Sequence, residues 1–139
     1  MRYWLLKSEP SSWSWQDQLA RGDAGEGWDG VRNHQASNNM KAMEIGDLAF
    51  FYHSVNEKQI GGIVEVIELY HPDPTDKNGR FGMVTVRAVK SMTKPVTLAD
   101  IKADDRLQHM SLVRQARLSV TPVSQPQWEI ILEKGATGL

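Results

Sequence analysis

Three runs in the middle of the chain decide the fold: LAFFYH at residues 48–53, QIGGIVEVIELY at 59–70 and FGMVTVRAV at 81–89. Each run is rich in apolar, β-branched or aromatic residues, and turn-forming residues lie between the runs. In the third run, Val84 and Val86 alternate with Thr85 and Arg87, a period typical of a strand with one buried face. We therefore expect three consecutive strands at the centre of the fold.

Shorter elements flank these strands. Residues 3–6 form an apolar, aromatic run that ends before Pro10, and we expect a strand there. The pairs Ser14 with Asp17 and Ser124 with Gln127 have the spacing of helix capping boxes. The other expected elements are a helix over 33–43, a short strand over 95–98, a small helix capped at Thr97 and Asp100, and a last strand over 117–123.

Two local patterns refine this outline. In the helix that follows Ser14, Trp15 and Leu19 lie four residues apart and share one helical face. Gly61 and Gly62 interrupt a strand, which indicates a bulge, a sharp bend, or close approach by a ligand or a second backbone. Many short strands with glycine bends and few helices favour an α+β fold, a compact mixed β-barrel of about five or six strands flanked by helices.

The bulk composition indicates one globular domain. The chain has 139 residues, of which 40% are hydrophobic and 24% charged, and these are ordinary values for such a domain. We expect a single domain over residues 1–135 and a short tail over 136–139. The chain has no cysteine, which excludes disulfides and fits a reducing compartment. Its first apolar run is too short for a signal peptide or a membrane span, so we expect a cytoplasmic protein with no membrane partner.

Charge is distributed unevenly along the chain. Residues 77–117 contain nine basic and three acidic residues, whereas residues 1–76 contain six basic and twelve acidic residues. The net charge of the whole chain is only −1. This asymmetry is compatible with a polynucleotide that touches one face. The alternative is a solvated surface whose charges average to neutrality, and charge alone leaves both interpretations open.

The sequence offers little support for catalysis. It has no G-x-G-x-x-G motif after a strand and no Walker-type loop, so no cradle for a nucleotide cofactor is visible. The four histidines are scattered without metal-ligand spacing, and no serine has the surroundings of a nucleophile elbow. We therefore expect no cofactor, no metal and no enzymatic activity.

Aromatic and amide side chains instead gather in the first 54 residues, which hold four of the five tryptophans: Trp4, Trp13, Trp15 and Trp28. Trp28 lies in a glycine-rich loop and has two open roles. It can plug the end of the barrel as part of the core, or it can form a pocket wall on which a base stacks. Asn33 can cap a helix, and its paired donor and acceptor can also read a base edge. His53 ends a strand, where either the backbone or a ligand can satisfy it.

Several segments taken together resemble the EVE domain family. The matching segments run nearly end to end and include YWLLKSEP at 3–10, WDGVRN at 28–33, FFYHS at 50–54, LVR at 112–114 and RLSV at 117–120. The resemblance implies a PUA-like fold, a compact barrel flanked by helices that is related to YTH and ASCH domains. It also implies that the partner is a nucleic acid, DNA or RNA, whose modified base the protein binds, with a modified cytosine as one candidate.

The resemblance further implies a set of site residues. Those expected to bind the ligand are Lys7, Ser8, Trp28, Asn33, Tyr52, His53 and Ser54. Apart from the resemblance, we expect Arg32 of the polar run 32–35 to bind the ligand as well, and Arg114 and Arg117 of the basic stretch to contact the nucleic-acid backbone. In this arrangement Trp28 stacks on a base that has left its own stack, and Tyr52 closes the other side. The family often has an arginine where this chain has Ser37, so we expect a phosphate contact or the base preference to differ.

Two other classes of function remain open. An adaptor protein whose aromatic cluster is only core would bind no nucleic acid. A small hydrolase acting on modified nucleosides would use His53 and Glu9 as acid and base.

Overall fold

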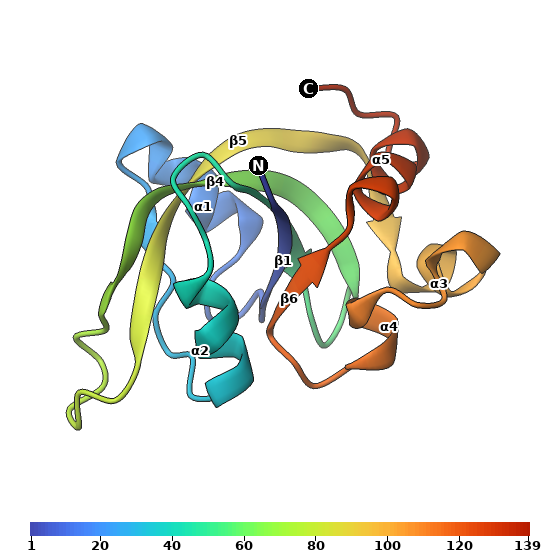
Figure 1. Ribbon diagram of the computed structural model, residues 1–139. Coiled ribbons are helices and arrows are strands. Elements are labelled where there is room, and N and C mark those ends of the chain that lie inside the picture. The colour runs from blue at the N-terminus through green and yellow to red at the C-terminus, as the bar shows by residue number, and fades with distance from the viewer.

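The computed structural model describes all 139 residues and contains one sheet with helices around it (Figure 1). The strands are β1 (Tyr3–Ser8), β2 (Glu26–Gly27), β3 (Leu48–His53), β4 (Gln59–Pro72), β5 (Gly82–Thr97) and β6 (Val120–Val123). The α-helices are α1 (Trp15–Ala20), α2 (His34–Lys41), α3 (Leu98–Lys102), α4 (Ser111–Arg114) and α5 (Gln125–Lys134). Two short 3-10 helices are η1 (Gly22–Ala24) and η2 (Asp105–Leu107). None of the helices has the length and apolar character needed to cross a bilayer.

All six strands belong to one mixed sheet in the order β2-β5-β4-β3-β1-β6. β1 and β3 are parallel, and every other neighbouring pair is antiparallel. The connection between β1 and β3 carries α1, β2 and α2, and α2 packs against β4, β5 and β6 where the sheet curves (Figure 1). The side chain of Asn39 fastens α2 there by donating to the Val120 carbonyl at 2.8 Å. The predicted α+β class and mixed sheet are thereby confirmed.

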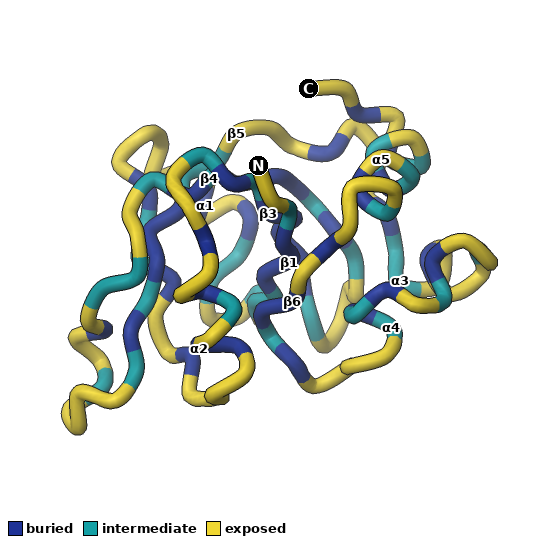
Figure 2. The backbone as a smooth tube through the Cα atoms, viewed as in Figure 1, coloured by how far each residue is buried: buried dark blue, intermediate teal, exposed yellow.

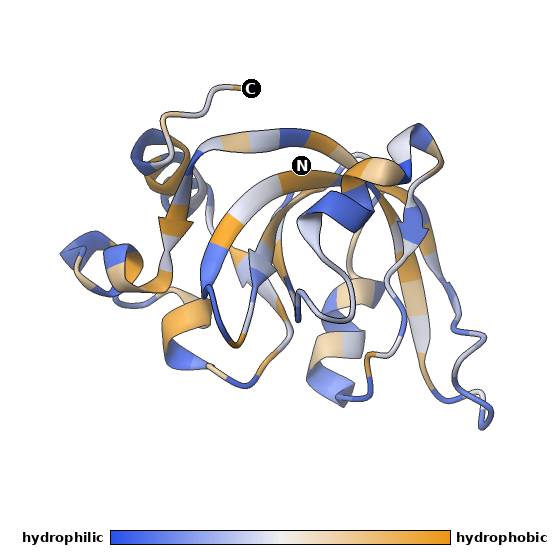
Figure 3. Ribbon diagram, turned by 180° about the vertical axis from the view of Figure 1, so that it is seen from behind, coloured by the Kyte–Doolittle hydropathy of each residue, from blue (hydrophilic) through white to orange (hydrophobic).

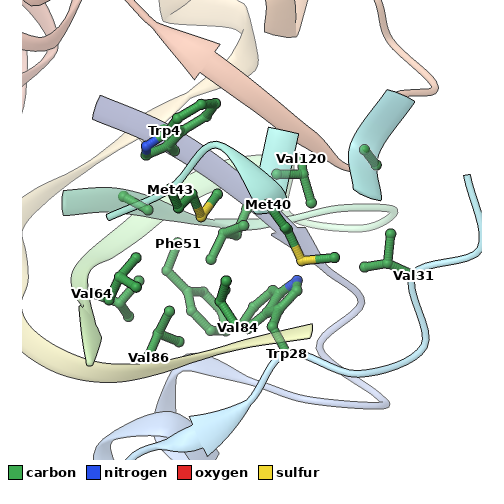
Figure 4. Close-up of a cluster of buried hydrophobic side chains, with 14 of the residues drawn as sticks. Trp4, Trp28, Val31, Met40, Met43, Phe51, Val64, Val84, Val86 and Val120 are labelled. Atoms are coloured by element: carbon green, nitrogen blue, oxygen red, sulfur yellow. The ribbon is translucent and has the colours of Figure 1, made fainter. Parts of the chain in front are cut away.

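Side chains that alternate between the two faces of the strands build two cores. On β1 and β3, Leu6 and Phe51 point into a core that also receives Ala36 and Met40 of α2 (Figure 4). Their neighbours Leu5 and Phe50 point to the opposite face, where α3, α4 and α5 cover them. These strand residues are fully buried, and burial of each stabilises the fold by about 1.5–3 kcal/mol. Figure 2 shows the buried strand centres between exposed loops.

Three helices begin at the residues that the sequence indicates. Ser14, Thr97 and Ser124 each form a complete capping box with the residue three positions further on. In such a box the side chain of each partner bonds to the backbone N–H of the other, which satisfies two amide groups that the helix leaves free. Asn33 caps α2 by accepting from the backbone N–H of Ala36 at 2.9 Å.

The inner face of α1 differs from the face that the sequence suggests. Trp15 is buried, but Leu19 is 38% exposed. Gln18 occupies the inner position and is fully buried. Its side-chain oxygen accepts from Trp13 Nε1 at 2.9 Å, and its amide nitrogen donates to the Val86 carbonyl at 3.2 Å. A polar side chain can take an interior position when its hydrogen-bonding groups are satisfied in this way.

Two strand boundaries also differ from the prediction. β5 is a single strand from Gly82 to Thr97, whereas the sequence predicts a separate strand over 95–98. Pro95 is tolerated within β5 because β2, the only other strand beside β5, pairs with it at residues 85 and 86 alone. β6 begins at Val120 and not at residue 117, because Leu118 donates its N–H to Gln115 in the turn that follows α4.

The glycine pair in β4 marks a bulge under a tryptophan. The register of β4 against β5 shifts between Ile60 and Gly62. A Cβ on Gly62 would clash with the indole of Trp15, whereas a Cβ on Gly61 would meet nothing closer than 4.0 Å. The close approach predicted at this pair therefore comes from a side chain of the same protein, and not from a ligand or a second backbone.

The short tail of residues 136–139 lies against β5. Thr137 is buried, and its Oγ1 accepts from the Thr93 N–H at 2.9 Å and donates to the Gly135 carbonyl at 2.8 Å. The same carbonyl accepts from the Lys94 N–H at 3.0 Å. These bonds satisfy part of the β5 edge that no strand covers.

Candidate nucleic-acid interface

A pocket of about 460 Å³ opens at the end of β1. It lies between the turn that follows β1 and the segment formed by β2 and the next three residues. Its lining residues are Lys7, Ser8, Glu9, Ser12, Trp13, Glu26, Gly27, Trp28, Asp29 and Gly30. The volume falls within the roughly 300–1,000 Å³ typical of small-ligand pockets.

A second hollow of about 470 Å³ lies beside α3 and η2, but its chemistry is less suited to a base. It contains no aromatic side chain. Its carboxylate Asp104 lies 2.8 Å from Arg106 and 3.0 Å from Lys134. Hydrogen bonds from these two cations hold the pKa of Asp104 well below its usual range. We therefore assign the candidate site to the pocket beside β1.

Trp28 belongs both to the core and to the wall of this pocket. It is 7% exposed, and its ring meets Phe51 edge-on with the ring centres 5.4 Å apart. Figure 4 shows the ring among the core side chains, close to Val84 and Met40. The Trp28 N–H donates to the Val84 carbonyl at 2.8 Å, which fixes the loop on β5. Trp28 is therefore a core residue that also lines the pocket.

Trp13 lines the same pocket from the turn after β1. Its carbonyl accepts from Ser8 Oγ at 2.6 Å, and its Nε1 donates to Gln18 at 2.9 Å, so both backbone and ring are held. The sequence groups Trp13 with the N-terminal aromatic cluster but gives no reason to place it in the site. Its position depends on the path of the turn after Ser8, which no residue spacing reveals.

Lys7 and Ser8 are the predicted site residues that the structure brings together with Trp28. The Lys7 ammonium group donates to the Ala116 carbonyl at 2.8 Å, and burial lowers the pKa of Lys7. An ammonium group has three N–H donors, so two remain for a ligand.

Tyr52 lies on the opposite face of β3 from Trp28. Because side chains alternate along a strand, Phe51 contacts Trp28, whereas Tyr52 packs with Leu5 in the second core. Burial raises the pKa of Tyr52. The hypothesis that Tyr52 closes the pocket across from Trp28 is wrong, and Trp13 is the second aromatic residue of the pocket.

His53 is satisfied within the protein. Its Nε2 accepts from the Trp15 N–H at 2.9 Å, and its Nδ1 lies 2.8 Å from a carboxylate oxygen of Glu57. The acceptor role of Nε2 assigns the ring proton to Nδ1, which then donates to Glu57. The next residue, Ser54, donates its N–H to the Ser8 carbonyl at 2.9 Å. Both residues therefore hold the ends of β1, β3 and α1 together, and neither lines the pocket.

Arg32 and Asn33 lie beyond the pocket lining as well. Arg32 forms an ion pair with the buried Asp73 at 3.1 Å and donates to the Thr75 hydroxyl at 2.9 Å. Asn33 uses its side-chain oxygen to cap α2. They follow Gly30, the last lining residue of this segment, where a φ of 80° turns the chain.

Arg114 and Arg117 are exposed and flank the residue that binds Lys7. Ala116, whose carbonyl accepts from Lys7, lies between them in the sequence. Arg114 donates to the Gln108 carbonyl at 3.1 Å. Arg117 makes no side-chain hydrogen bond or ion pair within the protein, so it is the freer of the two for a phosphate.

Ser37 does not face solvent. It is 3% exposed, and its Oγ lies 2.7 Å from Tyr70 Oη, which also accepts from the Gly82 N–H at 2.6 Å. These bonds tie α2 to β4 and β5. The position therefore acts on the packing of α2, and the expected change in a phosphate contact has no basis in this geometry.

A curved six-stranded mixed sheet with α2 on one face and α3, α4 and α5 on the other is a PUA-like α+β fold. The chain belongs to the EVE domain family, which residues 2–134 match. The predicted family and fold are confirmed.

Three proteins illustrate the relationship. Human thymocyte nuclear protein 1 is 32% identical over 94% of this chain and 72% of its own length. The structure of the human protein in complex with 5-methylcytosine-containing DNA aligns with this chain over 100% of both chains, with a TM-score of 0.91 and 30% identity. A crystal structure from Agrobacterium tumefaciens is 50% identical, with a TM-score of 0.96 over 99% of this chain and 94% of that one. A Zygosaccharomyces rouxii YTH domain bound to N6-methyladenosine RNA is similar in fold alone, with a TM-score of 0.58 and 15% identity over 96% of this chain and 86% of that one.

Proposed function

We propose that this protein is a non-catalytic reader that binds a modified base of a nucleic acid in the pocket lined by Trp13 and Trp28. The observation that carries the proposal is the presence of two indoles in one pocket of about 460 Å³, next to the polar groups of Lys7 and Ser8. The structure of human thymocyte nuclear protein 1 with 5-methylcytosine-containing DNA supports a base as the ligand.

The tryptophans supply the larger part of the binding energy in this proposal. Stacking of a base on an aromatic ring contributes about 1–3 kcal/mol, whereas release of the base from its own stack costs a few kcal/mol. Trp28 is held by the core, and Trp13 is held by Ser8 and Gln18, so little side-chain entropy is lost on binding. A methyl group on the base adds about 0.8 kcal/mol when it is buried. That increment distinguishes the modified from the unmodified base.

The rim of the pocket favours a base that carries an amino group. The carboxylates of Glu9 and Asp29 line the pocket and make no hydrogen bond or ion pair within the protein. An ionised carboxylate only accepts hydrogen bonds, and the N4 amino group of cytosine is a suitable donor. The free donors of Lys7 suit the carbonyl oxygen of the same base. A modified cytosine presents both groups and is the ligand that the pocket supports best.

The hydrolase alternative fits this geometry poorly. Both ring nitrogens of His53 are bonded, to Trp15 and to Glu57, and His53 does not line the pocket that contains Glu9. The two side chains are therefore not arranged as an acid and a base on one ligand. The adaptor alternative makes a different prediction, since an adaptor of this kind binds no oligonucleotide.

The test is a fluorescence titration at low salt with matched oligonucleotides that contain cytosine or 5-methylcytosine. We expect tighter binding of the methylated oligonucleotide, and an affinity about 5- to 150-fold lower in Trp13→Ala because the stacking energy is lost. The control is Tyr3→Ala, since Tyr3 is also half-buried and stacks on Trp128 with ring centres 4.4 Å apart, outside the pocket. This control should bind like the wild type.

Trp13 is the residue to change because it is only half-buried at the edge of the core, whereas Trp28 is 7% exposed within it. Trp13→Ala also removes the donor to the buried Gln18, so thermal unfolding is measured to verify that this variant is folded in the assay. Truncation of a buried tryptophan costs about 3–5 kcal/mol of stability, so an effect of Trp28→Ala on folding could not be separated from an effect on binding.

Equal affinity of the wild type for the two oligonucleotides would refute modified-base reading. Absence of binding to either would support the adaptor alternative, and release of a hydrolysed product would support the enzyme.

A further inference from the structure

The loop between β4 and β5, residues 73–81, turns its first aspartate inward. The carboxylate of Asp73 is buried and accepts from Gly30 N at 2.8 Å, Arg32 Nη1 at 3.1 Å, Thr75 N at 2.8 Å and Thr75 Oγ1 at 2.6 Å. Burial opposes ionisation, but the hydrogen bonds from Thr75, Gly30 and Arg32 outweigh it and lower the pKa of Asp73 to about 2. The negative charge of Asp73 is therefore balanced by hydrogen-bond donors within the protein.

The second aspartate, Asp76, stabilises the tip of the same loop. Asp76 accepts from the backbone N–H groups of Asn78, Arg80 and Phe81 at 3.0, 2.9 and 2.7 Å. Hydrogen bonds of this kind to an ionised acceptor are stronger than neutral ones. The 73–81 loop is therefore held in one shape by its own carboxylates.

The cations of the loop, in contrast, are free. Lys77 and Arg80 are exposed, and neither side chain forms a hydrogen bond or an ion pair within the protein. Figure 1 shows the loop projecting beyond the sheet beside α2, and Figure 3 shows its hydrophilic tip. At the base of the loop, Arg32 lies with its guanidinium carbon 5.8 Å from the centre of the Phe81 ring. Its side chain remains 39% exposed.

Most other basic residues of the 77–117 stretch are already engaged. Arg87 pairs with Glu65 and Asp23, Arg106 pairs with Asp104, Lys90 donates to the Gly138 carbonyl, and Arg114 donates to the Gln108 carbonyl. Lys94 and Lys102 are free but belong to the end of β5 and to α3, elements that lie away from the loop in Figure 1. Arg117 is also free, and it is next to Ala116, whose carbonyl accepts from Lys7. Lys77 and Arg80 are the free pair on a single loop that is connected to the pocket.

The connection runs through Gly30. This glycine lines the pocket, and its N–H donates to Asp73 at the start of the 73–81 loop. Arg32, two residues further on, binds both Asp73 and Thr75. Hydrogen bonds from Gly30 and Arg32 therefore link the wall of the pocket to the 73–81 loop.

We propose that the 73–81 loop is a phosphate-binding arm, in which Lys77 and Arg80 contact the sugar-phosphate backbone of the polynucleotide whose base enters the pocket. The inference rests on the proposed function and adds a second contact surface to it. Phosphate contacts position a nucleic acid without reading its sequence. The arm therefore raises the affinity for modified and unmodified polymers alike, and selection of the base remains with the pocket. Positive charge from the arm also offsets the repulsion between phosphates and the free carboxylate of Asp29.

The test compares two double variants that remove the same charge. In Lys77→Ala/Arg80→Ala the arm is lost, and in Lys94→Ala/Lys102→Ala two free lysines away from the loop are lost. The dissociation constant for one 5-methylcytosine oligonucleotide is measured against salt concentration. Each phosphate contact contributes about 0.7 to the slope of log affinity against log salt for a single strand and about 0.9 for a duplex. We expect the magnitude of the slope to be smaller by roughly 1.4 to 1.8 in the arm variant than in the wild type, and the control to keep the wild-type slope.

The outcomes separate this proposal from the proposed function. If the wild type prefers the methylated oligonucleotide and the arm variant keeps the wild-type slope, the arm is refuted while the reader stands. An equal loss of slope in the control also refutes the arm, because it assigns the effect to net charge. If the wild type binds no oligonucleotide, both proposals fail together. An unchanged ratio of affinities for the methylated and unmethylated oligonucleotides in the arm variant, together with the lower slope, supports the arm.

Discussion

Gly62→Ala tests how α1 is held on the sheet. The indole of Trp15 lies against the backbone of β4 so closely that a single added methyl group would overlap it. The same tryptophan donates its indole N–H to Ser91 Oγ at 2.9 Å and its backbone N–H to His53 at 2.9 Å. The ring cannot move away from a methyl group without straining these bonds.

The expected loss of stability follows from these contacts. Insertion of a methyl group into a packed core costs about 1–3 kcal/mol, and loss of one of the two hydrogen bonds adds about 1 kcal/mol. We therefore expect Gly62→Ala to lower the free energy of unfolding by roughly 2–4 kcal/mol. For a domain of this size, the same change corresponds to a decrease in Tm of roughly 6–16 °C.

The assay is thermal and denaturant unfolding of Gly62→Ala beside Gly61→Ala. Gly61 is the adjacent residue of the same strand, has no positive φ, and has room for a Cβ. Gly61→Ala should leave stability unchanged or raise it by about 0.4–1 kcal/mol, because alanine restricts the unfolded chain. Similar unfolding curves for the two variants would refute the packing of Trp15 described above.

Two further predictions concern Asp73 and Tyr52. Because the pKa of Asp73 in the folded protein, about 2, is below its ordinary value of 3.8, ionised Asp73 stabilises the fold fully above about pH 5, and this stability is lost as the pH falls toward 2. In Asp73→Asn, the unfolding free energy measured from pH 2 to 6 should lack this pH-dependent contribution, about 1–2 kcal/mol. The same pH dependence in the variant and the wild type would contradict the prediction. Tyr52→Phe should bind the methylated oligonucleotide within about twofold of wild type, since Tyr52 packs in the opposite core. A tenfold lower affinity of this variant would contradict the prediction and assign Tyr52 to the binding site.

The sequence predicts well those features that depend on residues close together in the chain. The capping boxes at Ser14, Thr97 and Ser124 require only a partner three residues away, and all three are present. The central strands follow from alternating or β-branched runs, because the two faces of a strand are set by its own period. The EVE resemblance adds the fold, because its segments are spread over nearly the whole chain.

The site is less predictable because it depends on contacts between distant segments. Alternation shows that Phe51 and Tyr52 face opposite sides, but only the tertiary fold determines which of them meets Trp28. Arg32 is held by Asp73, 41 residues away, and Lys7 by Ala116, 109 residues away. No spacing within either segment indicates these partners.

The central claim, that Trp13 and Trp28 receive a base, is tested most directly by the indole N–H resonances of the nitrogen-labelled protein during titration with a 5-methylcytosine oligonucleotide. The chain has five tryptophans, each of which gives one such resonance. Trp4 donates its indole N–H to the buried Asp47, and Trp128 lies in the second core, so both serve as internal references. We expect the Trp13 and Trp28 resonances to shift while those of Trp4 and Trp128 remain in place. Shifts confined to Trp4 or Trp128, or unchanged resonances at saturating oligonucleotide, would contradict the claim.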